Sequence, residues 1–355
     1  MEGFMATIRH IQKALIFGGV GYEREISVKS AERLYREMKE AGAEIFPTFI
    51  SPLGEWFLAK DEKTSPQALA KDPEALGERV YLKRIGDQGG FATDREFIKT
   101  GASIPILHGD FGEDGRIQGA LDTAGIPYVG CTLETSAVCR NKAILKSVLK
   151  CFGIPMLDWV VIPKGEDVDT AASRAERSLG YPMFVKPTSL GSSIGAGPAC
   201  ERKELIKRLD CARAVADGII IERYLAKRRE LECAFFEYKG KEYFTKPGEI
   251  RYNSEFYDYE SKYITGEANI LPQAEVDRGI IGAVRSLSKR IREVVGLRHF
   301  SRIDFFLTDD GEVYFNEINT IPGLTEASLF PLMARGASVD LAELFLDLSR
   351  SASEK

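Results

Sequence analysis

Histidines, tryptophans and paired cysteines are scarce in this chain. Its 355 residues include three histidines and two tryptophans, and so few histidines argue against a histidine-rich zinc site. The six cysteines contain no Cys-x-x-Cys pair, which predicts reduced thiols and therefore a cytoplasmic protein.

Long apolar runs and an excess of positive charge are also missing. No run approaches the roughly 18 apolar residues of a membrane span, and the apolar stretch 14–17 is too short for the core of a secretion signal. The net charge of −5 argues against an electrostatically driven nucleic-acid partner. We therefore expect no membrane and no nucleic-acid partner.

The length and the order of apolar segments predict several domains. A chain of 355 residues has room for two or three domains of ordinary size. A short apolar strand, 13–19, ends in glycines and precedes a helix over about 27–41, which is typical of a doubly wound parallel α/β sheet. Later strands and helices alternate less regularly, so we predict an α/β fold that is α+β in parts. The expected domains are 1–130, 131–222 and 223–355.

Other expected elements are single segments. A helix is expected over 134–152, with Ile144 and Phe152 on its inward face, and another over about 278–295. Residues 126–129 are expected to form a short strand.

The most informative segment is 301–319, which predicts a β-hairpin. Asp310-Gly311 is the dipeptide that best fits a two-residue type I′ turn. With these two residues as the loop, Asp304 faces Glu317 and Arg302 faces Asn319, all on one side of the hairpin. Leu307 then faces Tyr314, and Phe306 and Phe315 continue the acidic face.

Two opposed carboxylates need a compensating positive charge. Directly facing strand residues hold their Cβ atoms about 4.5–5.5 Å apart, where like charges are destabilising. Mg2+ takes oxygen ligands from one or two carboxylates and from substrate phosphates. The pattern therefore indicates a magnesium site, and a solvated acidic strand face is the alternative.

Segment 186–197 leaves a predicted strand and is rich in glycine and serine. Its backbone N–H groups are suited to cradle phosphate oxygens, with Lys186 as an added cation. The alternative is an ordinary turn, and the Gly-Lys-Ser/Thr of a Walker A loop is absent.

Four further motifs are weaker. The glycines at 18–21 do not complete a dinucleotide fingerprint, and 110–121 lacks the final glutamate of a calcium loop. The basic run 227–229 is expected to be a solvated charge run. His108, at the end of a predicted strand, belongs either near a site or to the structural core.

Read in order, these motifs resemble D-alanine:D-alanine ligases of the ATP-grasp superfamily. The resemblance rests on segments 18–27, 108–115, 186–197, 256–263, 302–304 and 316–323 and spans nearly the whole chain. It implies a three-domain ATP-grasp enzyme that joins two D-alanine molecules for peptidoglycan precursors. It also implies a homodimer.

The resemblance implies ATP between the second and third domains and two Mg2+ ions, with Mn2+ as a substitute and a monovalent cation as a further ligand. It assigns the metal to Asp304, Glu317 and Asn319. The nucleotide is assigned to Lys142 and Lys186 at the phosphates, Glu222, Arg223 and Leu225 at the base, and Glu230 at the ribose.

The amino-acid subsites also follow from the resemblance. It places the ammonium of the first D-alanine at Glu23 and its carboxylate at Arg302 and the N–H of Gly323. The remaining substrate contacts are assigned to His108, Lys262, Ser328 and Leu329. A loop over about 252–266 is expected to close over an acylphosphate through a hydrogen-bonded set of Glu23, Ser192 and Tyr263.

The chain departs from the family pattern at two places. The segment between Glu222 and Glu230 is one residue longer than in some relatives, and the run 227–229 stands where small residues are common. Asn316 replaces a usual apolar residue, and the predicted register places it on the face opposite the metal.

Rival interpretations stay open at this stage. Within the superfamily they are a ligase joining D-alanine to D-lactate or D-serine, and another carboxylate–amine ligase such as a carboxylase subunit. A non-catalytic nucleotide-binding protein is the rival from another class, and joint retention of Arg302, Asp304, Glu317 and Asn319 argues against it.

Overall fold

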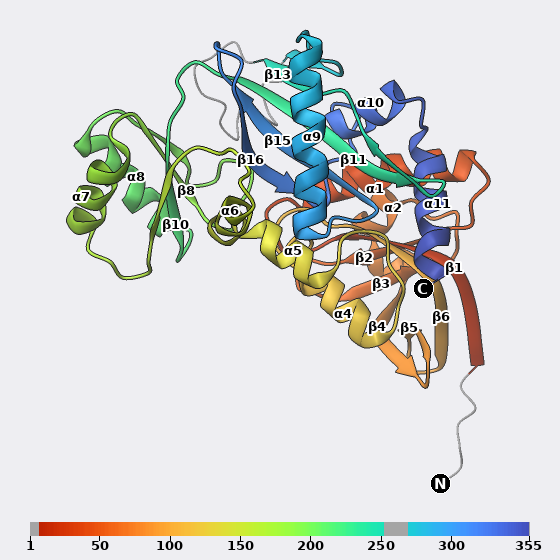
Figure 1. Ribbon diagram of the computed structural model, residues 1–355. Helices are drawn as coiled ribbons and strands as arrows, with labels where there is room; N and C mark the ends of the chain where they lie inside the picture. The colour runs from red at the N-terminus through yellow and green to blue at the C-terminus, as the bar shows by residue number, and fades with distance from the viewer. Residues whose placement is uncertain (1–6, 252–268, 355) are drawn as a thin grey trace.

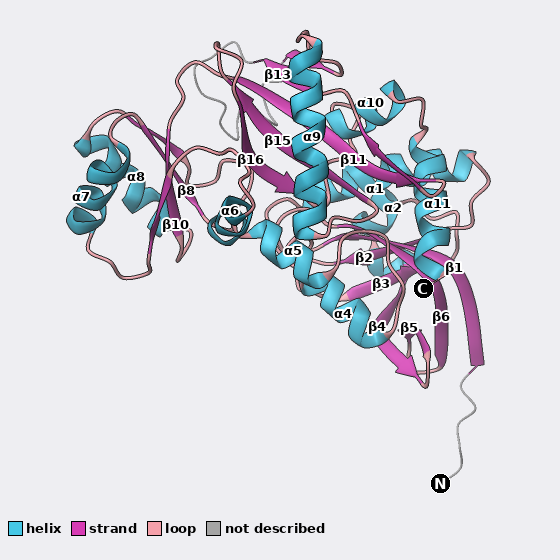
Figure 2. Ribbon diagram, viewed as in Figure 1, coloured by secondary structure: helices cyan, strands magenta, loops and turns pink. Residues whose placement is uncertain are grey.

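The structure is a computed structural model that describes residues 7–251 and 269–354. The chain forms three groups of strands and helices that lie next to one another (Figure 1). Helices and strands are mixed in each group (Figure 2), so the predicted α/β class is confirmed.

The first group contains six strands whose pairings close into a ring. Its elements are β1 (Thr7–Gly18), α1 (Arg24–Glu40), β2 (Phe46–Ile50), β3 (Trp56–Ala59), α2 (Pro66–Lys71), α3 (Pro73–Leu76), β4 (Gly77–Ile85), β5 (Gln88–Ala92), β6 (Glu96–Ile106), α4 (Arg116–Ala124) and α5 (Leu133–Arg140).

The parallel sheet predicted for this group is only partly correct. β1 pairs in parallel with β2 and with β6, but the four pairs from β2 to β6 through β3, β4 and β5 are antiparallel. Short connections such as 86–87 join only antiparallel strands, because a parallel crossover needs a dozen or more residues. Residues 126–129 contribute a single bridge, from Tyr128 to Ser103, in place of the expected strand.

Helix α1 positions the first residues of the site. It begins at Arg24 directly after Glu23, and buries Ala31, Leu34 and Met38. The chain leaves the helix at Gly42, whose φ of 79° is the left-handed conformation that glycine adopts without strain.

The second group is a four-stranded sheet in the order β7-β10-β8-β9 with two helices against it. Its elements are α6 (Lys142–Cys151), β7 (Trp159–Ile162), α7 (Val168–Leu179), β8 (Met183–Pro187), β9 (Gly197–Ala199), α8 (Arg202–Arg213) and β10 (Ile219–Arg223).

The single helix predicted over 134–152 is wrong. The chain breaks at Asn141, whose side chain caps α6 by accepting from the N–H groups of Ala143 and Ile144. The break changes the phase of the helix, so Leu145 and Leu149 face the core, while Ile144 and Phe152 are exposed.

The third group is built on the sheet order β14-β13-β11-β15-β16, with β12 paired to β11. Its elements are β11 (Arg229–Tyr238), β12 (Lys241–Phe244), β13 (Gly248–Arg251), β14 (Asn269–Leu271), α9 (Arg278–Val295), β15 (Phe300–Leu307), β16 (Val313–Asn319), α10 (Leu329–Gly336) and α11 (Leu341–Ser353). The helix predicted over 278–295 is confirmed as α9.

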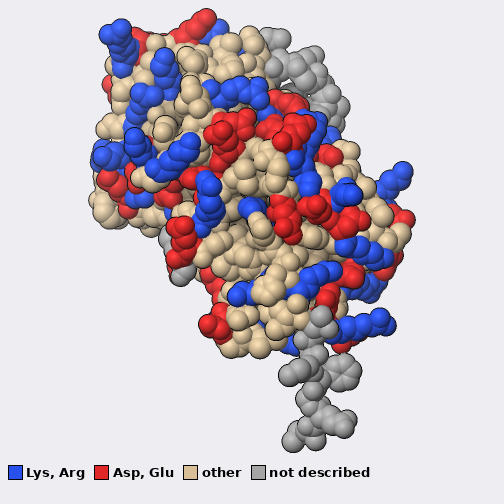
Figure 3. Space-filling view, turned by 90° about the vertical axis from the view of Figure 1, so that its right-hand side faces the viewer, with Lys and Arg blue, Asp and Glu red and all other residues tan. Residues whose placement is uncertain are grey.

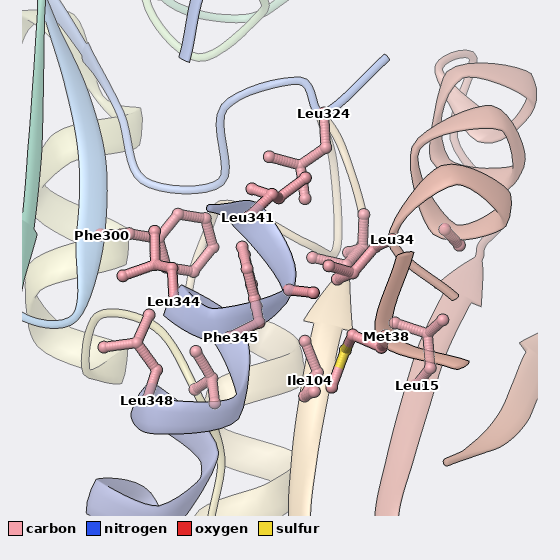
Figure 4. Close-up of a cluster of buried hydrophobic side chains, with 14 of the residues drawn as sticks. Leu15, Leu34, Met38, Ile104, Phe300, Leu324, Leu341, Leu344, Phe345 and Leu348 are labelled. Carbon is pink, nitrogen blue, oxygen red and sulfur yellow. The ribbon is translucent and has the colours of Figure 1, made fainter. Parts of the chain in front are cut away.

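One hydrophobic core joins the two ends of the chain. Helix α11 packs against α1 and β6, so that Phe345 lies on the side of the helix toward Met38 and Ile104, and Leu348 lies near Leu344 (Figure 4). The same cluster includes Leu324, which follows the β15–β16 hairpin. The first and third groups are therefore fixed to one another beside the site.

The surface next to these elements carries charges of both signs. On the face turned toward the viewer in Figure 3, Lys and Arg side chains are interspersed with Asp and Glu side chains. In the described ranges, 7–251 and 269–354, no helix is long and apolar enough to span a bilayer.

Candidate active site

The β15–β16 hairpin brings the predicted metal ligands together. Asp304 pairs with Glu317 and Arg302 pairs with Asn319, as the sequence predicts. Ile303 and Ile318, between them, point into the core behind the sheet.

The turn of this hairpin differs from the prediction. The N–H of Thr308 donates to the carbonyl of Glu312, so the loop is Asp309-Asp310-Gly311, and Gly311 has a φ of 87°. This is a three-residue loop with glycine in the left-handed conformation, not a two-residue type I′ turn. Leu307 therefore pairs with Val313 and not with Tyr314.

A β-bulge restores the register at the site. The next pair after Asp304–Glu317 is Phe305–Phe315, so Asn316 is the extra residue. Phe315 is consequently buried in the core, which contradicts its predicted place beside the acids. Asn316 faces the site, where the Nζ of Lys186 donates to its Oδ1 at 3.4 Å, so its predicted position on the opposite face is also wrong.

Arg302 is held by two carboxylates. Its Nε and Nη2 donate to the two oxygens of Asp304 at 2.8 and 2.7 Å, and its Nε lies 3.1 Å from Glu232 Oε2. Burial would lower the pKa of Arg302, but Asp304 and Glu232 outweigh it and raise that pKa well above its usual value. The guanidinium is therefore a fixed positive charge beside the proposed metal ligands.

The donor set of the hairpin fits a magnesium ion. Asp304 and Glu317 offer carboxylate oxygens, and the amide of Asn319 lies against them, with its Nδ2 3.0 Å from Asp304 Oδ2. Hard oxygen donors of this kind, completed by water and phosphate, are the usual environment of Mg2+. No group of three His, Cys, Asp or Glu side chains within residues 7–251 and 269–354 is placed to hold a metal, so the ion would need the amide and ligand oxygens.

Three lysines pair with glutamates of the site. The Nζ of Lys142 is 3.5 Å from Glu317 Oε2 and donates to the carbonyl of Leu190 at 2.8 Å. Glu222 pairs with two lysines: its Oε2 lies 2.9 Å from the Nζ of Lys186, and its Oε1 lies 3.1 Å from the Nζ of Lys146.

Burial lowers the pKa of Lys142 and of Lys146. It would raise the pKa of Glu222, but Lys146 and Lys186 hold that pKa below its usual value. Glu222 thus keeps its negative charge between two lysines, and the Lys186 ammonium is positioned where anionic phosphates can approach.

The Gly/Ser loop between β8 and β9 is strained at two serines. Ser192 and Ser193 have φ angles of 52° and 59°, a conformation that costs free energy for residues other than glycine and that clusters at functional sites. Ser192 Oγ donates to Glu23 Oε1 at 2.5 Å, which ties this loop to the start of α1.

Gly109 allows the chain to approach Glu23 closely. Its φ is 72°, and a Cβ at this position would lie 2.1 Å from Glu23 Oε2. Any larger residue would therefore displace the carboxylate that the resemblance assigns to a substrate ammonium.

His108 connects three segments through a chain of hydrogen bonds. Its Nδ1 lies 3.0 Å from the carbonyl of Ile321, and a carbonyl only accepts, so Nδ1 carries the proton. Its Nε2 then accepts from Ser30 Oγ at 2.9 Å, and the same Oγ accepts from the N–H of Leu324 at 3.2 Å. The neutral tautomer thus holds the loop that contains Gly323.

Replacing His108 with Gln should change how stability depends on pH. Burial lowers the pKa of His108, so its stabilising neutral form is present above the unfolded pKa of about 6.5 and is lost as the pH falls. The free energy of unfolding of the wild type should fall relative to the variant by up to about 1.4 kcal/mol per pH unit below that value. Urea unfolding at pH 7, 6 and 5 measures this, with His10→Gln, an exposed histidine, as the control. Parallel wild-type and His108→Gln profiles would contradict it.

A partly buried ion-pair cluster was not predicted from the sequence. Arg140, in the last turn of α5, pairs with Asp110 at 3.0 Å and with Glu113 at 3.2 Å. Burial raises the pKa of Glu113 to about 8, against the opposing effect of Arg140. Glu113 belongs to a motif that carries the resemblance, but its partner lies 27 residues away, and no pattern in the sequence links them.

The basic run 227–229 is only partly solvated, which corrects its predicted role. Lys227 is exposed, but Arg229 pairs with the buried Glu249 at 2.7 Å. Arg228 pairs with Glu230 at 2.8 Å, and its side chain is 15% exposed. Arg228 thus belongs to the wall of the site and Arg229 to a supporting strand.

Two adjoining cavities collect the predicted residues. The larger, about 1180 Å³, is lined by Lys142, Lys186, Ser192, Glu222, Arg223, Leu225, Glu230, Arg302, Asp304, Glu317, Gly323, Ser328 and Leu329, among others. The smaller, about 110 Å³, shares five of these and adds Glu23, His108, Glu113, Arg140 and Asn319. Lys262 and Tyr263 lie outside the described residues.

Family models match both halves of the chain. The model described as "D-ala D-ala ligase N-terminus" matches residues 12–131, and "D-ala D-ala ligase C-terminus" matches residues 148–349.

Individual relatives agree with this match over nearly full length. A D-alanine–D-alanine ligase of Streptococcus equi subsp. zooepidemicus is 33% identical, covering 96% of this chain and 95% of the relative. A D-alanine–D-alanine ligase of Caldicellulosiruptor bescii is also 33% identical, covering 97% and 96%. Among solved structures, the VanG D-Ala:D-Ser ligase of Enterococcus faecalis is 30% identical with a TM-score of 0.87, covering 97% of this chain and 100% of that one.

Proposed function

Because the chain belongs to the D-alanine–D-alanine ligase family of ATP-grasp enzymes, we propose that it joins two D-alanine molecules into D-alanyl-D-alanine for peptidoglycan precursors. The observation that carries this proposal is the cavity in which Lys142 and Lys186 lie beside the carboxylates of Glu222 and Glu317. Such a set of cations and hard oxygen donors suits the phosphates of ATP and their metal.

The nucleotide occupies the larger cavity. Lys142 and Lys186 bind its phosphates, and Ser192 and Ser193 of the strained loop line the same cavity. Glu222, Arg223 and Leu225 border the base and Glu230 the ribose. Phosphoryl transfer needs mainly positioning and charge neutralisation, which these residues supply.

Asp304, Glu317 and Asn319 would hold Mg2+, as two ions or with Mn2+ in its place, and a monovalent cation is a further candidate ligand of the site. When bound, the metal neutralises the negative charge that develops on the phosphates. Arg302 keeps Asp304 oriented toward this position through its paired hydrogen bonds.

The first amino acid occupies the smaller cavity, and the second lies in the adjoining part of the larger one. Glu23 binds the first ammonium, and Arg302 with the N–H of Gly323 binds the first carboxylate. The second D-alanine lies near Ser328 and Leu329, with His108 holding the Gly323 loop in place and Lys262 as a further contact.

The reaction is an activated acyl transfer. The carboxylate of the first D-alanine attacks the γ-phosphate of ATP to give an acylphosphate and ADP. The amine of the second D-alanine then attacks the acyl carbon and releases phosphate. Ser192 and Glu23, with Tyr263, close the site so that water does not compete for the acylphosphate.

Two further assignments follow from the family. We propose a homodimer, which the mass of the protein in solution would test. D-serine is the main alternative as second substrate, because the E. faecalis D-Ala:D-Ser ligase shares the fold at 30% identity.

The proposed activity is tested by phosphate release from ATP with D-alanine, L-alanine, D-serine and D-lactate in parallel. We expect release with D-alanine alone and a dipeptide product by mass spectrometry. Release only when D-serine or D-lactate accompanies D-alanine would favour the alternative, and release with none of these substrates would contradict the proposed function.

A further inference from the structure

Arg228 lies in the wall of the larger cavity between two aromatic rings. Its guanidinium carbon is 4.9 Å from the ring centre of Tyr224 and 5.0 Å from that of Phe306. Tyr224 in turn stacks on Phe184, with ring centres 5.7 Å apart and an interplanar angle of 23°. All four side chains line the cavity.

These side chains come from both sheets that border the cavity. Phe184 lies on β8 and Tyr224 directly follows β10, both in the second group, whereas Phe306 lies on β15 in the third. Arg228 is on the connection between β10 and β11 and contacts both sides. A planar cation between two π faces is attracted to each of them, so it holds the rings at a fixed separation.

The same guanidinium fixes an acidic residue of the cavity. One Nη donates to the carbonyl of Leu225 at 2.8 Å, and the other donates to Glu230 Oε1 at 2.8 Å. A solitary carboxylate at this place would repel a nucleotide that carries several negative charges. The ion pair offsets that repulsion and orients Glu230.

We propose that Arg228 is a specificity-determining residue for the nucleotide. It holds the aromatic wall against which the base packs, and it orients the Glu230 carboxylate to accept a ribose hydroxyl. This inference rests on the proposed assignment of the larger cavity to ATP.

Binding of ADP, measured by titration calorimetry without D-alanine, tests the inference apart from turnover. Arg228→Ala should weaken ADP binding about tenfold. The wild type should prefer ADP over 2′-deoxy- and 3′-deoxy-ADP, and both Arg228→Ala and Glu230→Gln should lose the preference for the same hydroxyl. Arg228→Lys, which keeps the charge but not the planar stack, should retain part of this hydroxyl preference. The KM for D-alanine should stay unchanged in all three variants.

Lys227→Ala is the matched control, because it removes one positive charge from the same segment at an exposed position. Thermal unfolding of each variant shows whether weak ADP binding reflects a damaged fold. If Arg228→Ala is destabilised, the hydroxyl preference of Arg228→Lys decides whether the inference holds. If Arg228→Ala and Arg228→Lys kept the same hydroxyl preference as Lys227→Ala, the inference would be overturned. The proposed function would stand in that case, provided that the wild type makes dipeptide. A wild type that binds no ADP would overturn the proposed function as well.

Discussion

Replacing Glu317 with Gln is expected to lower the turnover number about a thousandfold while the protein stays folded. Glu317 faces Asp304 across the hairpin and lies 3.5 Å from the ammonium of Lys142. The neutral amide removes one hard anionic donor, and a loss of several kcal/mol of transition-state stabilisation corresponds to this factor. Phosphate release at saturating ATP and D-alanine measures the change.

Two comparisons make the Glu317→Gln result specific. Glu312→Gln makes the same chemical change on the same hairpin, at an exposed position directly after the loop, and should keep full turnover. The Mg2+ concentration for half-maximal rate should rise in Glu317→Gln alone. Wild-type rate and metal dependence in Glu317→Gln would remove this residue from the metal site.

Asp304→Asn is a less selective variant than Glu317→Gln. Asp304 accepts two hydrogen bonds from Arg302, so the neutral amide leaves a partly buried guanidinium with less compensating charge. Two opposed carboxylates alone would suggest that neutralising either one relieves repulsion. Asp304 also compensates the charge of Arg302, so Asp304→Asn should lower the stability of the fold as well as the turnover number.

The pairing of Asp304 with Glu317 and of Arg302 with Asn319 was predicted correctly, although the turn and the pairs next to it were not. A loop one residue longer than expected shifts the pairing at Leu307, and the bulge at Asn316 shifts it back before Glu317. No local pattern in the sequence predicts this bulge. The bulge residue binds Lys186, which is 130 positions away, so a tertiary contact accompanies the irregularity.

Long-range ion pairs explain why parts of the site escaped prediction. Lys146 has no role assigned from the sequence, yet its side chain is buried because Glu222 pairs with it from a distant strand. Periodicity predicts burial from apolar residues only. Buried charges depend on partners that the fold supplies.

Ordered motifs predicted more of the site than periodicity did. The described residues assigned from the resemblance line the two cavities, and several come from loops, such as Ser192 and Gly323. Arg228 lies outside those motifs, in a run of basic residues that reads as solvated. Its position between Tyr224 and Phe306 depends on how two sheets meet.

Replacing Arg302 with Lys is expected to lower the turnover number by about 10²–10³, the scale for one lost oxyanion donor. The arginine spans Asp304 and Glu232 with a planar fork. A lysine ammonium keeps the charge but cannot reproduce that geometry while it also faces the reacting carboxylate. We expect the KM for ATP to change little, because the phosphate-binding lysines remain.

The matched control for Arg302→Lys is Arg298→Lys. Arg298 donates to the carbonyl of Gly130 at 2.8 Å and does not line either cavity, so its conversion should leave turnover unchanged. Steady-state kinetics on both variants separate the two roles. If Arg302→Lys kept the wild-type turnover number, the arginine would serve only to balance Asp304 and Glu232, and the oxyanion that forms as the amine attacks would need another donor, of which the N–H of Gly323 is the nearest candidate in the proposed arrangement.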